Sequence, residues 1–159
     1  MSNSYYNNKA KKMYNLYINN LPCKKVYAAV KKGDKFVVLK DEKNPKWKYQ
    51  LSGGGVEDGE DNVSAIKREI YEELNMNVKV IKSLGIINYV ATWEFEGKKF
   101  DVKYEAEIFL TEFVCYLNND KFGVDGEFDN SAISGIAEIS KFEMLENVSE
   151  FKKHNILLD

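Results

Sequence analysis

Apolar and polar residues alternate along much of the chain with the period of two that is typical of half-buried strands. The clearest run is residues 101–110, in which every second residue is apolar: Val102, Tyr104, Ala106, Ile108 and Leu110. Further strands are predicted within residues 25–40, 46–51, 78–95 and 100–117, with a short one near 133–139. Tight turns at Gly33-Asp34 and Glu96-Gly97 predict that neighbouring runs form hairpins.

The chain also contains one run with the helical period. Apolar residues recur at Val63, Ile66, Ile70 and Leu74, so the spacing predicts a helix over 62–74 that buries this stripe. Asp61 or Asn62 can serve as its N-cap, and asparagine at position 75 suits the left-handed conformation that ends many helices.

Weaker patterns predict the remaining elements. A closing helix is expected over 147–157, and residues 118–131 are expected to form a loop. Residues 1–20 are either a frayed arm or a short helix that turns Met13, Leu16, Tyr17 and Leu21 inward. Strands that flank one strong helix, with another helix after them, predict a layered α/β or α+β domain.

Length and composition agree with this organisation. A chain of 159 residues suffices for an N-terminal arm (1–20) and a single domain (21–159) with a substantial core. No apolar stretch has the length of a membrane span, and the polar opening lacks the apolar core of a secretory signal. Cys23 and Cys115 lie far apart in sequence, which favours reduced thiols and a cytoplasmic location.

The charge of the chain is unevenly distributed. Residues 1–50 hold twelve lysines and three acidic residues, whereas the remainder holds twenty-two acidic and eleven basic residues. An acidic region can bind divalent cations while a basic one contacts polyanions. The alternative is that these charges are spread over solvated faces.

The candidate chemistry lies in residues 51–76, "LSGGGVEDGEDNVSAIKREIYEELNM". On a helix, Glu69, Glu72 and Glu73 stand at positions i, i+3 and i+4, so their carboxylates share one face. Like charges at this spacing repel each other, and a divalent cation such as Mg²⁺ or Mn²⁺ would relieve the repulsion through hard oxygen ligands.

The glycines before this helix predict a close backbone approach. Gly53, Gly54 and Gly55 have no Cβ, so a loop made of them can fold the strand end against the carboxylates and offer a carbonyl oxygen as a further metal ligand. Arg68 carries a permanent charge on a planar fork, which suits it to bracing the cluster through Glu60 or another carboxylate.

At these residues the sequence resembles the Nudix hydrolase family. Its signature, G-x5-E-x7-R-E-U-x-E-E-x-G-U with U a bulky aliphatic residue, is matched in register over 54–76 by Gly54, Glu60, Arg68, Glu69, Ile70, Glu72, Glu73 and Met76. Asn75 replaces the second glycine of the signature, and asparagine can fulfil the same helix-ending role. The resemblance implies a Nudix α/β/α sandwich with a mixed β-sheet. It also implies metal-dependent hydrolysis of a nucleoside diphosphate linked to another moiety.

The resemblance further implies roles for individual residues. Glu72 and Glu73 would bind the metal ion, and Glu69 would either bind it or take a proton from the attacking water. Glu60 would orient Arg68, and the carbonyl of Gly53 would complete the site. Such sites often use one more carboxylate from a distant loop, for which Glu127 and Asp129 are the first candidates and Glu105 and Glu107 rank lower.

Substrate recognition is expected from aromatic and basic residues around the glycines. In Lys46, Trp47, Lys48 and Tyr49 charge and ring alternate, so lysines can contact phosphates while a ring stacks or packs. Gly54 and Gly55 are expected to approach the phosphates. Tyr89 and Trp93 can border the pocket, and His154 is read as a surface residue.

Three functions remain open on the sequence alone. The first is a pyrophosphohydrolase acting on a nucleotide, dinucleotide, nucleotide sugar or RNA 5′ end, and the intact Glu69, Glu72 and Glu73 favour it. The second is a ligand sensor that has the fold without turnover. The third is a nucleic-acid-binding surface in the lysine-rich first third. No membrane partner is expected, RNA is a possible one, and a homodimer through the arm stays open.

Overall fold

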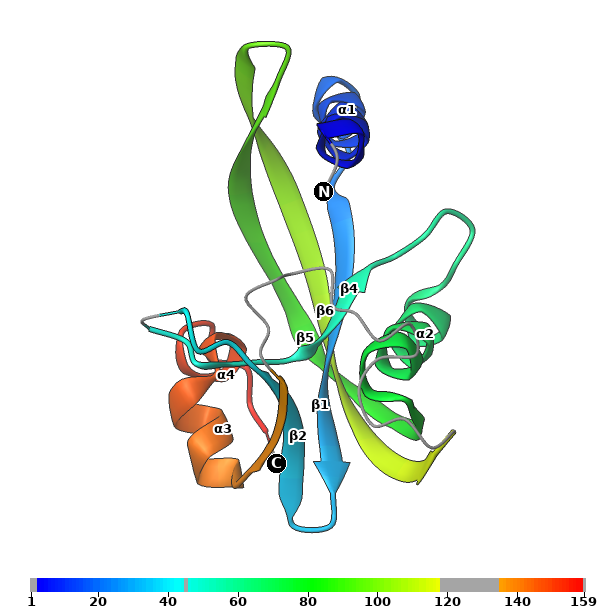
Figure 1. Ribbon diagram of the computed structural model, residues 1–159, viewed down its shortest axis with the longest axis vertical. Coiled ribbons are helices and arrows are strands. Elements are labelled where there is room, and N and C mark those ends of the chain that lie inside the picture. Colours follow the sequence, from blue (N-terminus) through cyan, green and yellow to red (C-terminus); the bar gives the residue numbers. More distant parts are fainter. Residues whose placement is uncertain (1–2, 45, 118–134, 159) are drawn as a thin grey trace.

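The computed structural model describes residues 3–44, 46–117 and 135–158. The order of elements is α1 (Asn3–Ile18), β1 (Cys23–Lys32), β2 (Lys35–Lys40), β3 (Tyr49–Gln50), β4 (Ser52–Gly55), α2 (Asn62–Leu74), β5 (Met76–Phe95), β6 (Lys98–Tyr116), β7 (Gly135–Ile139), α3 (Lys141–Asn147) and α4 (Ser149–Lys152) (Figure 1). In the part of the chain that these ranges cover, no helix is both long and apolar enough to cross a membrane.

A mixed sheet forms the centre of the molecule. Its strand order is β3-β2-β1-β6-β5, with β4 paired to β1 and β7 paired to β2. The pairing of β1 with β6 is parallel, for example Val26 opposite Glu107, and the other strand pairs are antiparallel. The mixed sheet is therefore confirmed, as are the predicted turns at Gly33-Asp34 and Glu96-Gly97 between paired strands.

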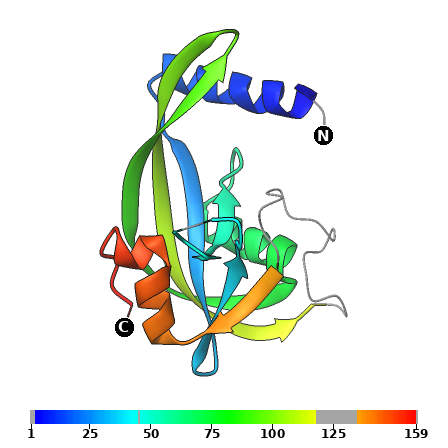
Figure 2. The ribbon, with the colours of Figure 1, turned by 60° about the vertical axis from the view of Figure 1, so that its left-hand side comes forward.

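Helices cover the two faces of the sheet. Val26, Ala28 and Val30 of β1 are fully buried in a cluster with the apolar face of α2. Ala29, whose side chain points the other way as strand geometry requires, is buried in a second cluster with α3 and α4. Figures 1 and 2 show α2 on one side of the sheet and α3 with α4 on the other. The predicted α/β/α sandwich is confirmed.

Beyond the layered body, β5 and β6 continue as a long hairpin, and α1 lies across it (Figure 2). Met13 is 3% exposed and packs with Phe100 and Val102 of β6. Residues 3–18 thus form a helix, one of the two alternatives for this region. Its inward face differs from the predicted one, since Tyr17 and Leu21 are about half exposed.

Three local predictions need correction. Val63 of α2 is 43% exposed, and Ala65 is buried instead, because burial depends on what covers a position as well as on the helical period. The closing helix predicted over 147–157 begins earlier and ends earlier, and it is two helices, α3 (Lys141–Asn147) and α4 (Ser149–Lys152), separated by Val148 in an extended conformation. The first of them begins at a capping box formed by Ser140 and Glu143.

The predicted strand over 46–51 is also shorter than expected. Only Tyr49 and Gln50 pair, with β2. The side chain of Asn44 accepts hydrogen bonds from the backbone N–H groups of Lys46 (2.9 Å) and Trp47 (2.8 Å). This side-chain turn holds the preceding backbone away from the sheet.

Candidate active site

The carboxylates of α2 are fixed against β4. Asp61 caps the start of the helix by accepting from Ser64 N (2.7 Å), and Asn75 ends it in the left-handed conformation, with φ 57° and ψ 37°. Between these caps, Glu73 Oε1 accepts hydrogen bonds from Ser52 Oγ (2.8 Å) and from the backbone N–H of Gly53 (2.9 Å). The helix caps and β4 together set the direction of the acidic face.

The glycines form a strand and not the loop that the sequence predicts. Gly53, Gly54 and Gly55 belong to β4 and pair with β1. A Cβ on Gly53 would collide with the carbonyl oxygen of Val26, and a Cβ on Gly54 would lie 2.6 Å from Glu69 Oε1. The lack of side chains therefore serves the close approach of β4 to β1 and α2, while hydrogen bonds of the sheet keep the backbone extended.

Arg68 joins several acidic groups of the site. Its Nε and Nη2 donate to the two carboxylate oxygens of Glu60 at 2.8 and 2.9 Å, and Nη2 also donates to the carbonyl of Gly55 (2.9 Å). Nη1 donates to Glu69 (3.0 Å) and lies 3.4 Å from Glu72. The hydrogen bonds from Arg68 lower the pKa of Glu60 to about 2, and they raise the pKa of Arg68.

Arg68 also lies between acidic side chains of α2 that would otherwise repel each other. Glu69 and Glu72 are neighbours on the helix, and the guanidinium stands beside both. The repulsion from which the sequence predicts a divalent cation is thus partly relieved by a side chain. Within the described ranges, no three His, Cys, Asp or Glu side chains converge closely enough to hold a metal ion.

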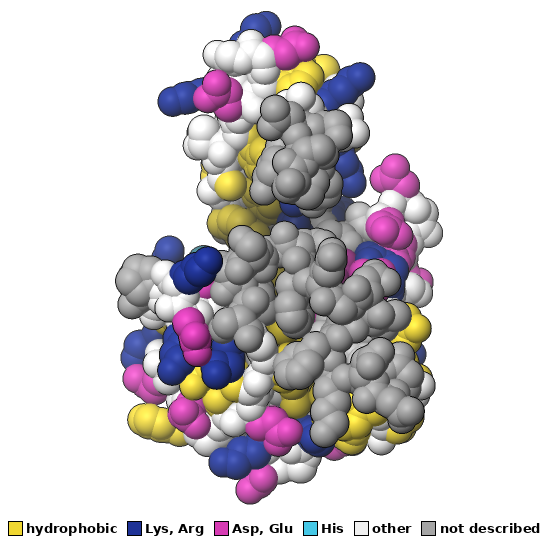
Figure 3. Space-filling model, in the orientation of Figure 1, with side chains coloured by type: hydrophobic (Ala, Val, Ile, Leu, Met, Phe, Trp, Pro, Cys, Tyr) yellow, Lys and Arg dark blue, Asp and Glu magenta, His cyan; other side chains and the backbone are white. Residues whose placement is uncertain are grey.

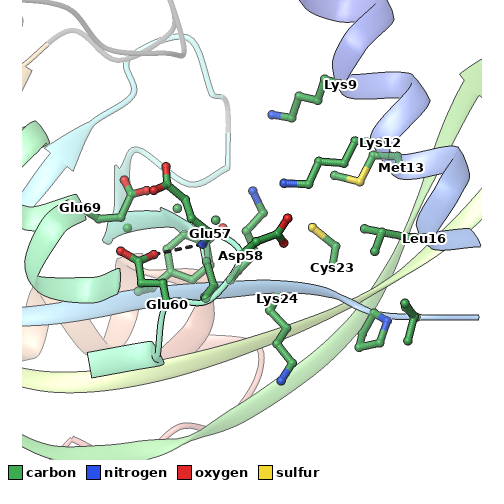
Figure 4. Close-up of a pocket in the computed structure, with 18 of the residues that line it drawn as sticks. Lys9, Lys12, Met13, Leu16, Cys23, Lys24, Glu57, Asp58, Glu60 and Glu69 are labelled. Atoms are coloured by element: carbon green, nitrogen blue, oxygen red, sulfur yellow. Dashed lines mark hydrogen bonds between the residues drawn. The ribbon is translucent and has the colours of Figure 1, made fainter. Parts of the chain in front are cut away.

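A cavity of about 1070 Å³ opens in front of these groups. Its lining includes Gly53–Glu60, Glu69 and Glu73 on one side and residues of α1 on the other. Figure 4 shows Lys9 and Lys12 of α1 reaching towards the segment that carries Glu57 and Asp58. Acidic side chains also gather over this β4–α2 segment, at the right of Figure 3.

Not every predicted site residue lies at this cavity. Gly54 and Gly55 line it, as do Gly53, Glu69 and Glu73. Lys46 and Lys48 are exposed on the segment before β3, where each amino group lies over the ring of the following residue. Trp47 borders a smaller cavity of about 150 Å³, together with Tyr27, Tyr49 and Glu150.

The candidates for an additional carboxylate are distributed differently. Glu127 and Asp129 lie outside the described residues. Glu107 Oε1 accepts from Asn62 Nδ2 (2.8 Å) at the start of α2. Glu105, its neighbour two positions earlier on β6, is half-buried.

The aromatic candidates belong to another part of the molecule. Tyr89 stacks on Tyr104 with 4.9 Å between ring centroids, and Trp93 donates to the Tyr104 hydroxyl (2.7 Å). Neither ring borders either of the two cavities described above. His154 is half-buried just beyond α4.

The sequence analysis missed several residues of the cavity. Lys9, Lys12 and Lys25 line the cavity beside the buried free thiol of Cys23. Ser52, which does not line the cavity itself, donates to Glu73 at its wall. A signal was available for the first two lysines: they stand at i and i+3 on α1, so they share a face.

Comparison with known proteins agrees with this site. The model of the NUDIX domain matches residues 23–154, from the start of β1 to just beyond α4. The chain therefore belongs to the Nudix hydrolase family, whose members generally use divalent metal ions. Helix α1 lies outside the matched region.

Individual relatives support the same assignment. An RNA pyrophosphohydrolase from Pelagibacter ubique (strain HTCC1062) is 32% identical over 146 residues, which is 85% of this chain and 87% of that protein. Among solved structures, a NUDIX hydrolase from Nitrosomonas europaea has a TM-score of 0.54 at 22% identity, covering 79% of this chain and 77% of its own. An Ap4A hydrolase from C. elegans has a TM-score of 0.52 at 17% identity, covering 83% and 89%. The two structures support the fold alone.

Proposed function

We propose that this Nudix hydrolase is a metal-dependent pyrophosphohydrolase that cleaves a nucleoside diphosphate linked to another moiety. The observation that carries the proposal is the acidic face of α2, which β4 and Arg68 hold at the wall of a cavity large enough for a nucleotide. The similarity to an RNA pyrophosphohydrolase places an RNA 5′ end among the substrates to be tested first.

The residues at hand suit a divalent cation by their chemistry. Three carboxylates on one helix face, with backbone carbonyls of β4 nearby, are the hard oxygen donors that Mg²⁺ and Mn²⁺ prefer. We assign the metal to Glu69, Glu72 and Glu73 with the carbonyl of Gly53, and Glu127 is the first candidate for one more ligand. A bound ion would offset phosphate charge and lower the pKa of a coordinated water.

The protein's own groups then divide the remaining work. Glu69 is the proposed base for the attacking water, because its carboxylate sits against Gly54 at the cavity wall. Arg68 keeps Glu69 and Glu72 in place and is itself held by Glu60. Gly54 and Gly55 leave space for phosphate close to the backbone, and Lys46, Trp47 and Lys48 are proposed to contact the rest of the substrate from the segment before β3.

The test is turnover by the purified full chain with Mg²⁺ or Mn²⁺. Substrates would be a 5′-triphosphorylated oligoribonucleotide, a dinucleoside tetraphosphate, nucleoside triphosphates and nucleotide sugars, with product separation by chromatography. Glu72→Gln should lower kcat by about 10³-fold or more, since it removes a charge that acts on the transition state. It should also weaken Mn²⁺ binding, measured by titration calorimetry.

A matched control is available in Glu94→Gln. Glu94 is an exposed carboxylate on the β5–β6 hairpin, so its neutralisation should leave kcat unchanged. Equal loss in both variants, or full activity in Glu72→Gln, would contradict the assigned site. A parent protein that binds these compounds without turnover would instead be a ligand sensor.

A further inference from the structure

Three lysines line the main cavity together with its acidic residues. Lys9 and Lys12 come from α1, and Lys25 comes from β1. In Figure 4 the side chains of Lys9 and Lys12 extend from the helix into the space in front of Glu57 and Asp58. The cavity therefore has acidic residues of α2 and of the segment before it on one side and Lys9 and Lys12 on the other, while Lys25 lies close enough to Glu69 for their charges to interact. The three lysines together are called the basic wall.

The basic wall is not neutralised by ion pairs. Among the described residues, no carboxylate oxygen lies within 4.0 Å of the amino groups of these three lysines, and the lysines that do form ion pairs are elsewhere: Lys32, Lys40 and Lys152. Lys9 lies over the ring of Trp93 (5.8 Å) and Lys25 over that of Tyr104 (5.9 Å). These ring contacts hold the side chains in place without removing their charge.

Lys12 is exposed, but Lys9 and Lys25 are partly buried, and the charge of Lys25 is costly for the protein alone. Burial lowers the pKa of Lys25, and the nearby charges of Lys9 and Lys12 add smaller lowerings, while Cys23 and the carboxylate of Glu69 act in the opposite direction. An anion in the cavity would offset these lowerings. Lysine amino groups are compact point charges that commonly bind phosphate.

The packing of α1 shows that the wall is held in place. Met13 stands one turn after Lys9 and next to Lys12, and it is buried against the β5–β6 hairpin. Tyr14 of the same helix packs on Phe95 and Phe100, at centroid distances of 5.7 and 5.4 Å. Helix α1 lies outside the region that matches the family model, so Lys9 and Lys12 are not part of the matched domain, whereas Lys25 is.

We propose that Lys9, Lys12 and Lys25 form a second anion site, which binds phosphate groups of the substrate beyond the diphosphate held at α2. This inference rests on the proposed function. The proposed site selects substrates with at least three phosphates over substrates in which a diphosphate carries a sugar or another uncharged group. The additional phosphates can belong to a polyphosphate chain or to the phosphodiester backbone of an RNA 5′ end.

The experiment compares two double variants of the full chain. Lys9→Gln/Lys12→Gln removes two charges of the basic wall while keeping the length of the side chains. Lys11→Gln/Lys79→Gln removes two exposed lysines that do not line the cavity, one of them on the same helix. Thermal unfolding followed by circular dichroism confirms that both variants fold.

The expected result is a selective change in KM. For a dinucleoside tetraphosphate or a 5′-triphosphorylated oligoribonucleotide, Lys9→Gln/Lys12→Gln should raise KM about tenfold and change kcat less than about twofold, because each lysine contributes a charge-assisted phosphate contact. For a nucleotide sugar with two phosphates, KM should stay at the value of the control. An equal rise in KM for both substrate classes, or no rise, would overturn the proposal.

Binding without turnover separates this inference from the proposed function. Glu72→Gln protein is titrated with inorganic tripolyphosphate and with the oligoribonucleotide, with and without the two lysine substitutions. Weaker binding after loss of Lys9 and Lys12 supports the basic wall even if the parent hydrolyses nothing, and unchanged binding refutes it even if hydrolysis is confirmed. If Lys9 and Lys12 contact the RNA backbone, their loss should also lower the slope of log K against log salt concentration for the oligonucleotide by about 1.4. If they contact a polyphosphate chain, their loss should weaken the binding of tripolyphosphate and of the oligonucleotide equally.

Discussion

Helices α1 and α2 both face the main cavity, yet the protein treats their charges in opposite ways. On α2 the carboxylates are tied down, since Arg68 donates to Glu60 and Glu69 and β4 donates to Glu73. On α1, Lys9 and Lys12 have no ion-pair partner in the described part of the chain. Polar contacts hold α2 in its direction, while apolar and aromatic contacts hold α1 on the hairpin.

This difference fits the two tasks that we propose for these helices. Groups that must keep a fixed geometry for chemistry are surrounded by short hydrogen bonds, which restrict them before a substrate arrives. Groups that attract a flexible, highly charged ligand need less restriction and keep their charge available. The comparison predicts that steric and electrostatic changes in and around α2 and β4 lower the stability of the protein, whereas at α1 the loss of an apolar contact does so.

The largest effect is expected where β4 meets β1. Gly53→Ala would place a Cβ against the carbonyl of Val26, so β4 would have to move away from β1 at the expense of at least about 3 kcal/mol of stability. Gly55→Ala is the matched control, because a Cβ there meets no atom within 4 Å. Urea unfolding should show a large loss for the first variant and a small change for the second, and similar losses would contradict the packing described for β4.

A smaller effect is expected at the attachment of α1. Met13→Ala would remove a buried side chain from the cluster with Phe100 and Val102, which should cost about 2 to 3 kcal/mol. The exposed Asn15→Ala on the same helix is its control. Urea unfolding would measure both variants. If Met13→Ala costs no more than Asn15→Ala, α1 does not pack on the hairpin as described.

The smallest effect should depend on pH. Because Arg68 lowers the folded-state pKa of Glu60 from 4.5 to about 2, ionised Glu60 stabilises the fold above pH 4.5, and this stabilisation is lost as the pH falls from 4.5 towards 2. Glu60→Gln should therefore cost about 1 to 2 kcal/mol at pH 7, allowing for solvent screening, and progressively less in acid.

Its measurement is the free energy of unfolding of parent and variant between pH 7 and pH 3. The difference caused by Met13→Ala should stay constant over the same range, because that contact is apolar. A pH-independent difference for Glu60→Gln would show that Arg68 does not bind Glu60 as described.

The sequence was sufficient for the parts of the molecule that depend on local spacing. Alternating strands around one periodic helix predicted a layered α/β or α+β domain, and the resemblance to the Nudix family added the α/β/α sandwich. The conformation of Asn75 follows from its place at the end of that helix. That Glu69, Glu72 and Glu73 share a face follows from the helical period alone.

Long-range contacts explain what the sequence could not show. The glycines of β4 suggested a flexible loop, and only pairing with β1 shows why an extended backbone needs them. The segment before β3 has the alternation of a strand, but in the structure its backbone N–H groups donate to the side chain of Asn44. The sequence left residues 1–20 open as a frayed arm or a short helix, because the position of Lys9 and Lys12 depends on contacts of α1 with the β5–β6 hairpin, which lies far along the chain.

The long β5–β6 hairpin thus allows one active-site region to be altered in two independent halves. Substitutions where α1 packs on the hairpin can move Lys9 and Lys12 away from the cavity without changing β4 or α2. With the roles proposed here, such substitutions would change which phosphorylated compounds are accepted while the groups of α2 and β4 stay as they are.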